Sequence, residues 1–410
     1  DRRFARPLFF LRDRVWRVYT GGAGFGAFLG DGSADGHTPE EWIASAVRAL
    51  GPAGRSEREG VSRLADGGGY FDDLSRDHRQ ALLGSRRELG VLVKLLDSAV
   101  RLPVQAHPDR AFSRRHLHSD HGKAESWLVL ATRPGARIYL GFKNATTKAQ
   151  LADAARRSET DENAMVSLLN EIPVRPGDVF FIPAGMIHAI GAGCLMLEVQ
   201  EPTDFTVQPE RRCADYTLSD REMYLGLDAD TALDVFDFSV HGEAAVARAR
   251  RTPQVIGRTD GCLRESLISY ADTPCFAIKR VTLTACAHTL RSAPAVCVVT
   301  DGAGEITFGP ERRPLRRGDC FFLPCAAAGR VVLYAAYRAL SPGCALRSRS
   351  RFSNTNGLFA AMIPSVGQPS VCPQSAQVAK PFSRTQRCTG QSISQNGVFA
   401  PSTRQPVQQI

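Results

Sequence analysis

The sequence has no Cys-x-x-Cys pair, no cysteine before position 194 and no run of 18 apolar residues. A zinc ribbon or a redox dithiol needs closely spaced cysteines, so neither is expected, and most of the 11 cysteines are predicted to be small buried side chains. A membrane-spanning helix needs the long apolar run, so none is expected. The apolar stretch 8–11 is too short and too charged on its far side for a signal peptide. We therefore expect a cytoplasmic protein.

Lysine is also scarce, and the net charge of +9 comes mainly from arginine. The arginines are scattered along the chain, and no long basic block is interleaved with aromatic residues. This distribution argues against a nucleic-acid partner, because surfaces that bind phosphate backbones concentrate their positive charge. The 410 residues are too many for one small core and predict two or three domains.

The first 90 residues contain two helical patterns. Thr38-Pro39-Glu40-Glu41-Trp42 has the order of a helix start, with Thr as N-cap and Pro at the first helical position, and the predicted helix ends at Gly51-Pro52. A second helical region is predicted at about 72–90. The glycine-rich run 21–26 lacks the Gly-x-Gly-x-x-Gly register between a strand and a helix, so it does not indicate a dinucleotide site.

Short apolar runs separated by Gly and Pro dominate from residue 91, which is typical of a β-sandwich or barrel. Helical patterns interrupt them at 147–171 and 216–238, and the arginine-rich stretch 240–272 is predicted to be a solvated linker. After about residue 345, Ser, Gln, Thr and Pro dominate, which predicts a disordered tail. The predicted strands occupy 91–96, 102–107, 125–131, 136–142, 172–174, 179–183, 194–199, 275–287, 295–300, 304–308, 320–324 and 330–338.

One unit of sequence occurs twice. Residues 175–183 read Arg-Pro-Gly-Asp-Val-Phe-Phe-Ile-Pro, and residues 316–324 read Arg-Arg-Gly-Asp-Cys-Phe-Phe-Leu-Pro. Gly-Asp predicts a tight turn, and the apolar run after it predicts a strand. The repeat therefore predicts two copies of one β-fold.

Candidate metal ligands lie on neighbouring predicted strands in the first copy. Gln105 and His107 are two residues apart, so on a strand both side chains point to one face. Glu125 begins the next apolar run, and His188 follows the strand of the first repeat in Pro183-Ala-Gly-Met-Ile-His188. Two imidazoles, a carboxylate and an amide oxygen suit a divalent transition metal. The remaining cluster, His116, His118 and His121, is interpreted as solvated loop residues rather than a second metal site.

The motifs around these residues resemble the three signatures of type I phosphomannose isomerases, and the last also resembles half of a cupin motif. They are 105–109 (Gln-Ala-His-Pro-Asp), 122–127 (Gly-Lys-Ala-Glu-Ser-Trp) and 183–191 (Pro-Ala-Gly-Met-Ile-His-Ala-Ile-Gly). The glycines at 21–22 and the stretch 39–45 add to the resemblance, which spans roughly residues 15 to 340.

This resemblance implies a mainly β chain with helical insertions, made of two cupin (jelly-roll) β-barrels plus a helical cap. The expected domains are an N-terminal segment with helices packing on the first cupin (1–90), a metal-binding cupin with a helical insertion at about 147–171 (91–215), a helical segment and linker (216–272), a second, degenerate cupin without metal (273–342) and the tail (343–410). We expect a monomer or a weak oligomer.

The resemblance further implies a zinc-dependent interconversion of mannose 6-phosphate and fructose 6-phosphate, with one Zn²⁺ held by Gln105, His107, Glu125 and His188. Lys123 would contact the substrate. Glu198, which follows an apolar strand run, is a candidate general acid or base beside the metal. Asp204 is a further candidate substrate contact.

At position 208 the chain departs from the family. The family has a catalytic arginine in the segment that resembles 202–208, whereas this chain has Gln208, with Arg211 and Arg212 just beyond. A phosphate needs a fixed cation, which favours Arg211 or Arg212 in that role. Two alternatives remain: a sugar-binding cupin with a structural metal and no isomerase activity, and another metal cupin enzyme such as an iron oxygenase.

Overall fold

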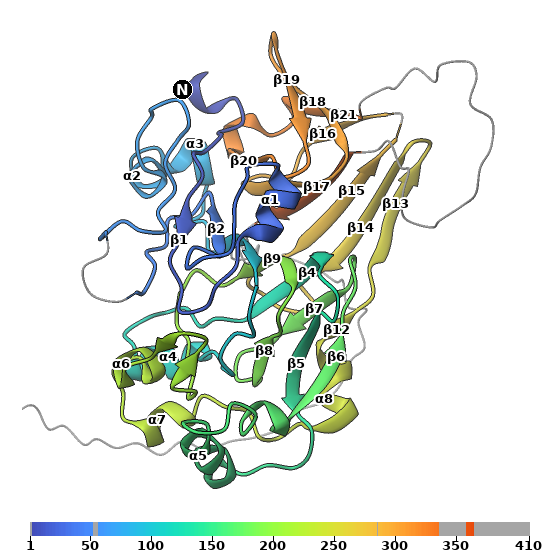
Figure 1. The fold of residues 1–410 in the computed structure, drawn as a ribbon. Coiled ribbons are helices and arrows are strands. Elements are labelled where there is room, and N and C mark those ends of the chain that lie inside the picture. Colours follow the sequence, from blue (N-terminus) through green and yellow to red (C-terminus); the bar gives the residue numbers. More distant parts are fainter. Residues whose placement is uncertain (1, 52–55, 285, 336–357, 365–410) are drawn as a thin grey trace, which may run out of the picture. The chain divides into compact units, whose positions relative to one another are not determined.

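A computed structural model describes residues 2–51, 56–284, 286–335 and 358–364 (Figure 1). The part of the chain before the first predicted cupin contains short elements. These are η1 (Arg2–Phe4), β1 (Arg14–Val15), α1 (Ala23–Leu29), β2 (Glu40–Ile43), α2 (Phe71–Asp77) and α3 (Arg79–Leu83).

Strands and short helices alternate in the next 160 residues or so. They are β3 (Leu92–Asp97), α4 (Arg110–His116), β4 (Glu125–Thr132), β5 (Arg137–Phe142), α5 (Lys148–Arg157), η2 (Val166–Leu168), β6 (Leu169–Pro173), β7 (Val179–Ile182), β8 (His188–Ile190), β9 (Cys194–Gln200), β10 (Arg212–Cys213), β11 (Tyr216–Thr217), α6 (Asp220–Tyr224), α7 (Ala229–Leu233) and α8 (Gly242–Ala249).

The rest of the described chain is almost entirely β. It consists of β12 (Arg250–Arg251), β13 (Gln254–Thr259), β14 (Cys262–Ile268), β15 (Ile278–Leu283), β16 (Ala287–Leu290), β17 (Ala295–Asp301), β18 (Ala303–Phe308), β19 (Glu311–Arg316), β20 (Cys320–Leu323), η3 (Cys325–Ala327), β21 (Val331–Ala335) and β22 (Leu358–Pro364). The fold is thus mainly β with helical insertions, as predicted. Every helix within the described ranges is too short or too polar to span a bilayer.

Two large antiparallel sheets share one strand order. The first sheet runs β1-β2-β3-β9-β4-β7-β12, and the second runs β13-β14-β15-β22-β17-β20, so β3-β9-β4-β7 corresponds to β15-β22-β17-β20. Smaller sheets accompany them, β6-β5-β8 in the first half and β16-β21-β18-β19 in the second. Helices α5 and α7 pack on the sheet β6-β5-β8 in one apolar cluster that includes Phe142, Leu151 and Leu233 (Figure 1).

The repeated Arg-x-Gly-Asp units form matching turns. The Asp178 carboxylate accepts a hydrogen bond from the Arg175 backbone N–H at 3.1 Å, and Asp319 accepts one from Arg316 at 2.8 Å. Gly177 and Gly318 both have positive φ, which glycine adopts without strain. After the turns, β7 pairs with β4 through Phe180 opposite Trp127, and β20 pairs with β17 through Phe321 opposite Cys297. In this register Ala295 occupies the place that corresponds to Glu125.

The predicted helix at 38–50 is wrong. Residues 40–43 form the buried strand β2, with Trp42 opposite Lys94 of β3 and Ile43 opposite Val93. A helix N-cap is worth about 1 kcal/mol, whereas burying Trp42 and Ile43 against β3 stabilises the strand by several times that amount. The local helix signal is therefore overridden by tertiary packing.

Two further predictions need correction. Residues 240–272 are α8, β12, β13 and β14, with β13 and β14 forming an antiparallel pair, instead of a linker. Within the predicted disordered tail, β22 pairs with β15 on one side and β17 on the other. The run Leu-Phe-Ala-Ala-Met-Ile at 358–363 is apolar enough for a strand, but the polar composition around it hides the signal. The rest of the tail, 343–357 and 365–410, lies outside the described residues.

The glycine-rich segment encloses a buried carboxylate. Asp97, at the end of β3, accepts hydrogen bonds from the backbone N–H groups of Gly22 at 2.7 Å and Gly24 at 2.9 Å, and from Arg133 at 2.7 Å. A Cβ atom on Gly24 would lie 2.2 Å from Asp97 Oδ1. The glycines thus allow the backbone at 22–24 to pack closely against the Asp97 carboxylate.

We expect Gly24→Ala to lower the free energy of unfolding by about 1–3 kcal/mol, because either α1 or the Asp97 carboxylate must shift. Gly36→Ala is the matched control, since a Cβ there meets no atom within 4 Å. Urea unfolding of both variants measures the effect. Equal stability of the two variants would contradict the packing role of Gly24.

Candidate active site

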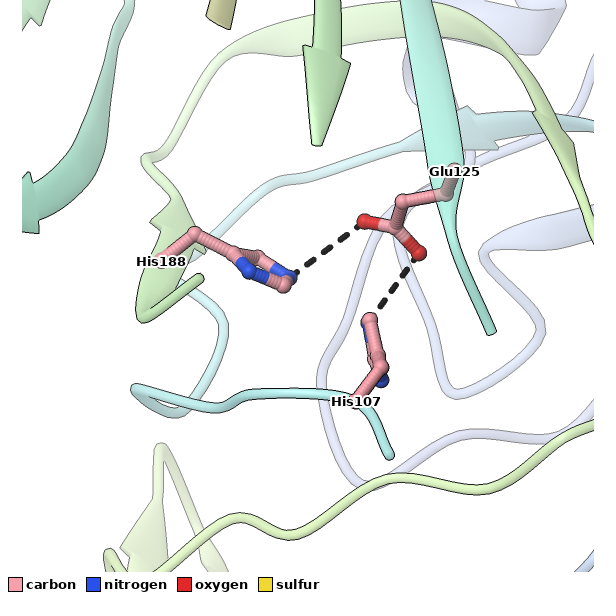
Figure 2. A group of neighbouring side chains, drawn as sticks. All are labelled: His107, Glu125 and His188. Carbon is pink, nitrogen blue, oxygen red and sulfur yellow. Dashed lines mark ion pairs between the residues drawn. The ribbon is translucent and has the colours of Figure 1, made fainter. Parts of the chain in front are cut away.

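Three elements bring the predicted metal ligands together. Glu125 begins β4, His188 begins β8, and His107 lies in the extended segment just before α4. The sequence predicted a strand at 102–107, but this segment is not a strand of a sheet. It runs beside β8 through paired backbone hydrogen bonds between Gln105 and His188, 2.9 Å each. Figure 2 shows both imidazoles directed at the Glu125 carboxylate.

The donor atoms of this group face one another. His107 Nε2 lies 3.0 Å from Glu125 Oε2, and His188 Nε2 lies 3.3 Å from Glu125 Oε1. Each Nδ1 is placed to donate to a backbone carbonyl, that of Phe205 at 3.0 Å and that of Met186 at 2.8 Å. Both Nε2 lone pairs are therefore directed at the carboxylate. Within the described part of the chain, the buried His107 Nε2 and Glu125 Oε2 have no hydrogen-bond partner.

Such an arrangement fits a cation. Among the described residues, His107, Glu125 and His188 form a group whose ligand atoms all lie within 4.8 Å of one another, and all three are buried. The Gln105 amide reaches His188 Nε2 at 3.3 Å through its nitrogen; a half-turn of the amide puts the oxygen at the same place. The Gln105 amide therefore lies beside the His107–Glu125–His188 group. The group could hold one divalent metal ion.

Electrostatics favour the metal-binding protonation states. Burial and the nearby Lys123 lower the pKa of His107 to about 3, so its imidazole is neutral at physiological pH. Burial by itself would raise the pKa of Glu125, but His107 and Lys123 outweigh it and hold the pKa well below its ordinary value. Neutral imidazole and ionised carboxylate are the forms that bind metals.

A cavity of about 790 Å³ opens above this group. Its size lies within the range of small-molecule sites, roughly 300–1,000 Å³. Of the residues predicted from sequence, those in its wall are Gln105, Lys123, Glu125, Glu198, Asp204 and Gln208. His107 and His188 contact Glu125 but are not among the described residues of the wall. Arg211 and Arg212 are not among the described residues of the wall; Arg211 pairs at the surface with Glu159 and Asp220.

Buried charges continue along the cavity wall. Lys94 Nζ lies 3.5 Å from both Glu40 Oε1 and Glu198 Oε1. Arg17 pairs with Glu40 at 3.0 Å and with Asp204 at 3.2 Å. The sheet places the partners of Lys94, which is opposite Glu198 on β9 and Trp42 on β2.

The two carboxylates beside Lys94 differ in pKa. Glu40 also accepts hydrogen bonds from Tyr19 at 2.6 Å and Trp42 at 2.7 Å, and despite its burial Arg17 and Lys94 hold its pKa far below the ordinary value. Burial raises the pKa of Glu198 to about 8, because Lys94 offsets only part of the lost solvation and Glu125 adds repulsion. Glu198 can therefore exchange a proton near neutral pH.

Lys123 lies beside Glu125 and borders the cavity. Its ammonium group donates to Thr206 Oγ1 at 3.3 Å and lies 3.7 Å from Glu125 Oε2. Burial lowers its pKa from the ordinary lysine value. The side chain is buried yet borders the cavity.

Sequence reasoning missed Arg17, Glu40 and Lys94. A signal existed for Lys94, a single charge inside the apolar run Leu-Val-Lys-Leu-Leu, as it does for Glu198 in Leu-Met-Leu-Glu-Val. A lone charge in a buried strand needs a partner. Glu40 was hidden by the helix signal, and nothing in the sequence pairs Arg17 with Asp204. Of the histidine cluster, His116 borders the cavity and His121 pairs with Glu88.

A buried group that could hold a metal ion, beside a cavity lined by acid–base side chains, is typical of enzymes that act on small polar molecules. Comparison with known proteins narrows this class. No protein-family model matches the chain. The mannose-6-phosphate isomerase of Streptococcus mutans is 31% identical over 326 residues, which cover 78% of this chain and 93% of that protein. A mannose-6-phosphate isomerase of Bacillus subtilis is 30% identical over 329 residues, with the same coverage.

Solved structures agree on the fold. The mannose 6-phosphate isomerase structure from Bacillus subtilis superimposes with a TM-score of 0.64 at 20% identity, covering 87% of this chain and 98% of that one. A structure of a phosphomannose isomerase variant from Salmonella typhimurium gives a TM-score of 0.60 at 13% identity, covering 88% of this chain and 100% of that one. The chain belongs to the mannose-6-phosphate isomerase family and is an enzyme of that type.

Proposed function

We propose that this protein interconverts mannose 6-phosphate and fructose 6-phosphate through an enediol(ate), with one zinc ion held by Gln105, His107, Glu125 and His188. The supporting observation is the position of this group: Gln105 and Glu125 border a cavity that Glu198 also borders, and burial raises the pKa of Glu198 to about 8. When bound, the metal would polarise the substrate carbonyl and stabilise the negative charge that develops on the neighbouring oxygens.

The protein's own residues supply proton transfer and orientation. Moving the carbonyl between C1 and C2 requires a proton to leave one carbon and reach the other, and Glu198 is the proposed acid–base group. Lys94 keeps the Glu198 carboxyl in place by its contact at 3.5 Å. Lys123 is proposed to donate to a substrate oxygen. Asp204 and Gln208 border the same cavity and are proposed as further substrate contacts.

We also propose a domain arrangement for this enzyme. Matching strand orders support two cupin barrels, the first over about 91–215 with the metal, and the second beginning near 273 without it. The pairing of β22 with β17 supports a second copy that reaches beyond 342. The apolar cluster that joins Phe4 and Leu8 to Val93 supports packing of the segment 1–90 on the first copy, and the same cluster includes Phe322 of the second. Free thiols at the eight described cysteines support the cytoplasm as the compartment. A monomer or weak oligomer remains our expectation.

The second candidate is a sugar-binding protein with a structural metal. Gln208, in place of the family arginine, is the observation that favours it. A coupled assay for fructose 6-phosphate formation from mannose 6-phosphate separates the two. We expect turnover by the purified protein and loss of turnover after chelation, with the fold retained. A metal-loaded protein that binds mannose 6-phosphate without converting it would establish the binding protein instead.

A further inference from the structure

Among the described residues of the cavity wall, one cationic side chain, Arg221, has no carboxylate partner. The arginine and lysine side chains of this wall are Arg17, Lys94, Lys123 and Arg221. The first three each lie within 4 Å of at least one buried carboxylate. Arg221, on α6 at the rim, has no ion pair or hydrogen bond within the described part of the chain. Its positive charge is thus available to a ligand.

The acidic groups next to Arg221 are occupied elsewhere. Asp220 pairs with Arg211 at 2.6 Å. Glu222 forms the capping box of α6, where Oε2 accepts from the Ser219 backbone N–H at 2.8 Å and Oε1 accepts from the Tyr216 hydroxyl at 2.7 Å. Both neighbours of Arg221 therefore have their charges satisfied by other partners. Arg211, which the sequence suggested as a phosphate ligand, instead forms an ion pair with Asp220, so Asp220 does not pair with Arg221.

Gln208 fixes the helix that carries Arg221. Its side-chain amide donates to the Glu222 carbonyl at 3.3 Å, and its backbone N–H donates to the Met223 carbonyl at 2.9 Å. The residue that replaces the family arginine therefore contacts the backbone of α6 directly. An arginine at 208 would itself place a positive charge at the cavity. Gln208 instead contacts α6, and Arg221 of that helix supplies the positive charge.

We propose that Arg221 binds the phosphate group of the substrate, and that Gln208 is a positioning residue for it. This inference rests on the proposed function. A phosphate dianion needs a cation whose hydrogen-bonding groups are not already used, and a guanidinium can donate two hydrogen bonds to it. The arrangement accounts for the absence of arginine at 208 without loss of phosphate recognition.

Titration calorimetry with sorbitol 6-phosphate tests the proposal, because this sugar alcohol has no carbonyl to isomerise. We expect Arg221→Gln to weaken its binding by about 10- to 100-fold, the loss of one charge-assisted contact, and to leave the affinity for unphosphorylated sorbitol unchanged. Arg175→Gln is the matched control, an exposed arginine whose side chain is 88% accessible on the turn before β7. It should change neither affinity by more than about twofold.

Gln208→Ala tests the positioning role through coupling to Arg221. Alone it should weaken sorbitol 6-phosphate binding by about three- to tenfold, and in the Arg221→Gln background it should have no further effect. Wild-type affinity in Arg221→Gln, or a larger loss in Arg212→Gln, would overturn the assignment. If only the proposed isomerase function is wrong, the result differs: the protein would bind sorbitol 6-phosphate through Arg221 but would not convert mannose 6-phosphate.

Discussion

Replacing Glu125 with Gln should leave the purified protein with less than about a tenth of the metal that the wild type retains, and isomerase activity should fall by about 10³-fold. The carboxylate is buried between two imidazole Nε2 atoms at 3.0 and 3.3 Å. A neutral amide at this position removes the only anionic ligand of the group. Metal analysis after gel filtration, together with the coupled assay, measures both effects.

Glu171→Gln is the control for this experiment. Glu171 lies on β6, is exposed, and pairs with Arg137 at the surface, so its loss should change neither metal content nor turnover. One equivalent of metal retained in Glu125→Gln would show that the ligand set is wrong. Metal loss with full activity would show that the metal takes no part in the reaction.

The second large effect concerns Glu198. We expect Glu198→Gln to lower kcat by about 10²- to 10⁴-fold while the metal content stays at the wild-type level. The substitution keeps the size of the side chain and removes only its ability to exchange a proton. Steady-state kinetics with metal analysis of the same samples separate this result from that of Glu125→Gln. A kcat within a few-fold of the wild-type value would assign proton transfer to another residue.

The raised pKa of Glu198 has a consequence for stability. The folded value of about 8 lies above the ordinary 4.5, so the folded state holds this proton more tightly than the unfolded chain. The resulting stabilisation is full below pH 4.5 and is lost as the pH rises through about 8. Chelated Glu198→Gln should therefore gain stability relative to the chelated wild type between pH 5 and pH 9. A difference independent of pH would contradict the raised pKa.

The grouping of His107, Glu125 and His188 was predictable because each residue lies in a short motif. Gln105 and His107 are separated by one residue, and His188 follows the turn of the repeated unit, so local sequence places all three. Their tertiary convergence on Glu125 is as expected, although the segment that carries Gln105 and His107 is held by single bridges, Gln105 to His188 and Ala106 to Val207, rather than within a sheet.

The charge network was not predictable, since it depends on pairing between strands far apart in the sequence. Lys94 meets Glu40 and Glu198 because β2, β3 and β9 are neighbours in one sheet. A helix predicted at 38–50 would have removed Glu40 from that sheet. The same limit applies to Arg221, whose place in the cavity follows from the contact between Gln208 and α6.

Zinc titration of the chelated protein tests most directly the central claim, a metal-dependent isomerase at the His107–Glu125–His188 group. Conversion of mannose 6-phosphate should rise linearly with added zinc and reach a plateau at one equivalent per chain. No such rise should occur in Glu125→Gln. Full conversion by the chelated wild type, or none at a bound equivalent of zinc, would contradict the account.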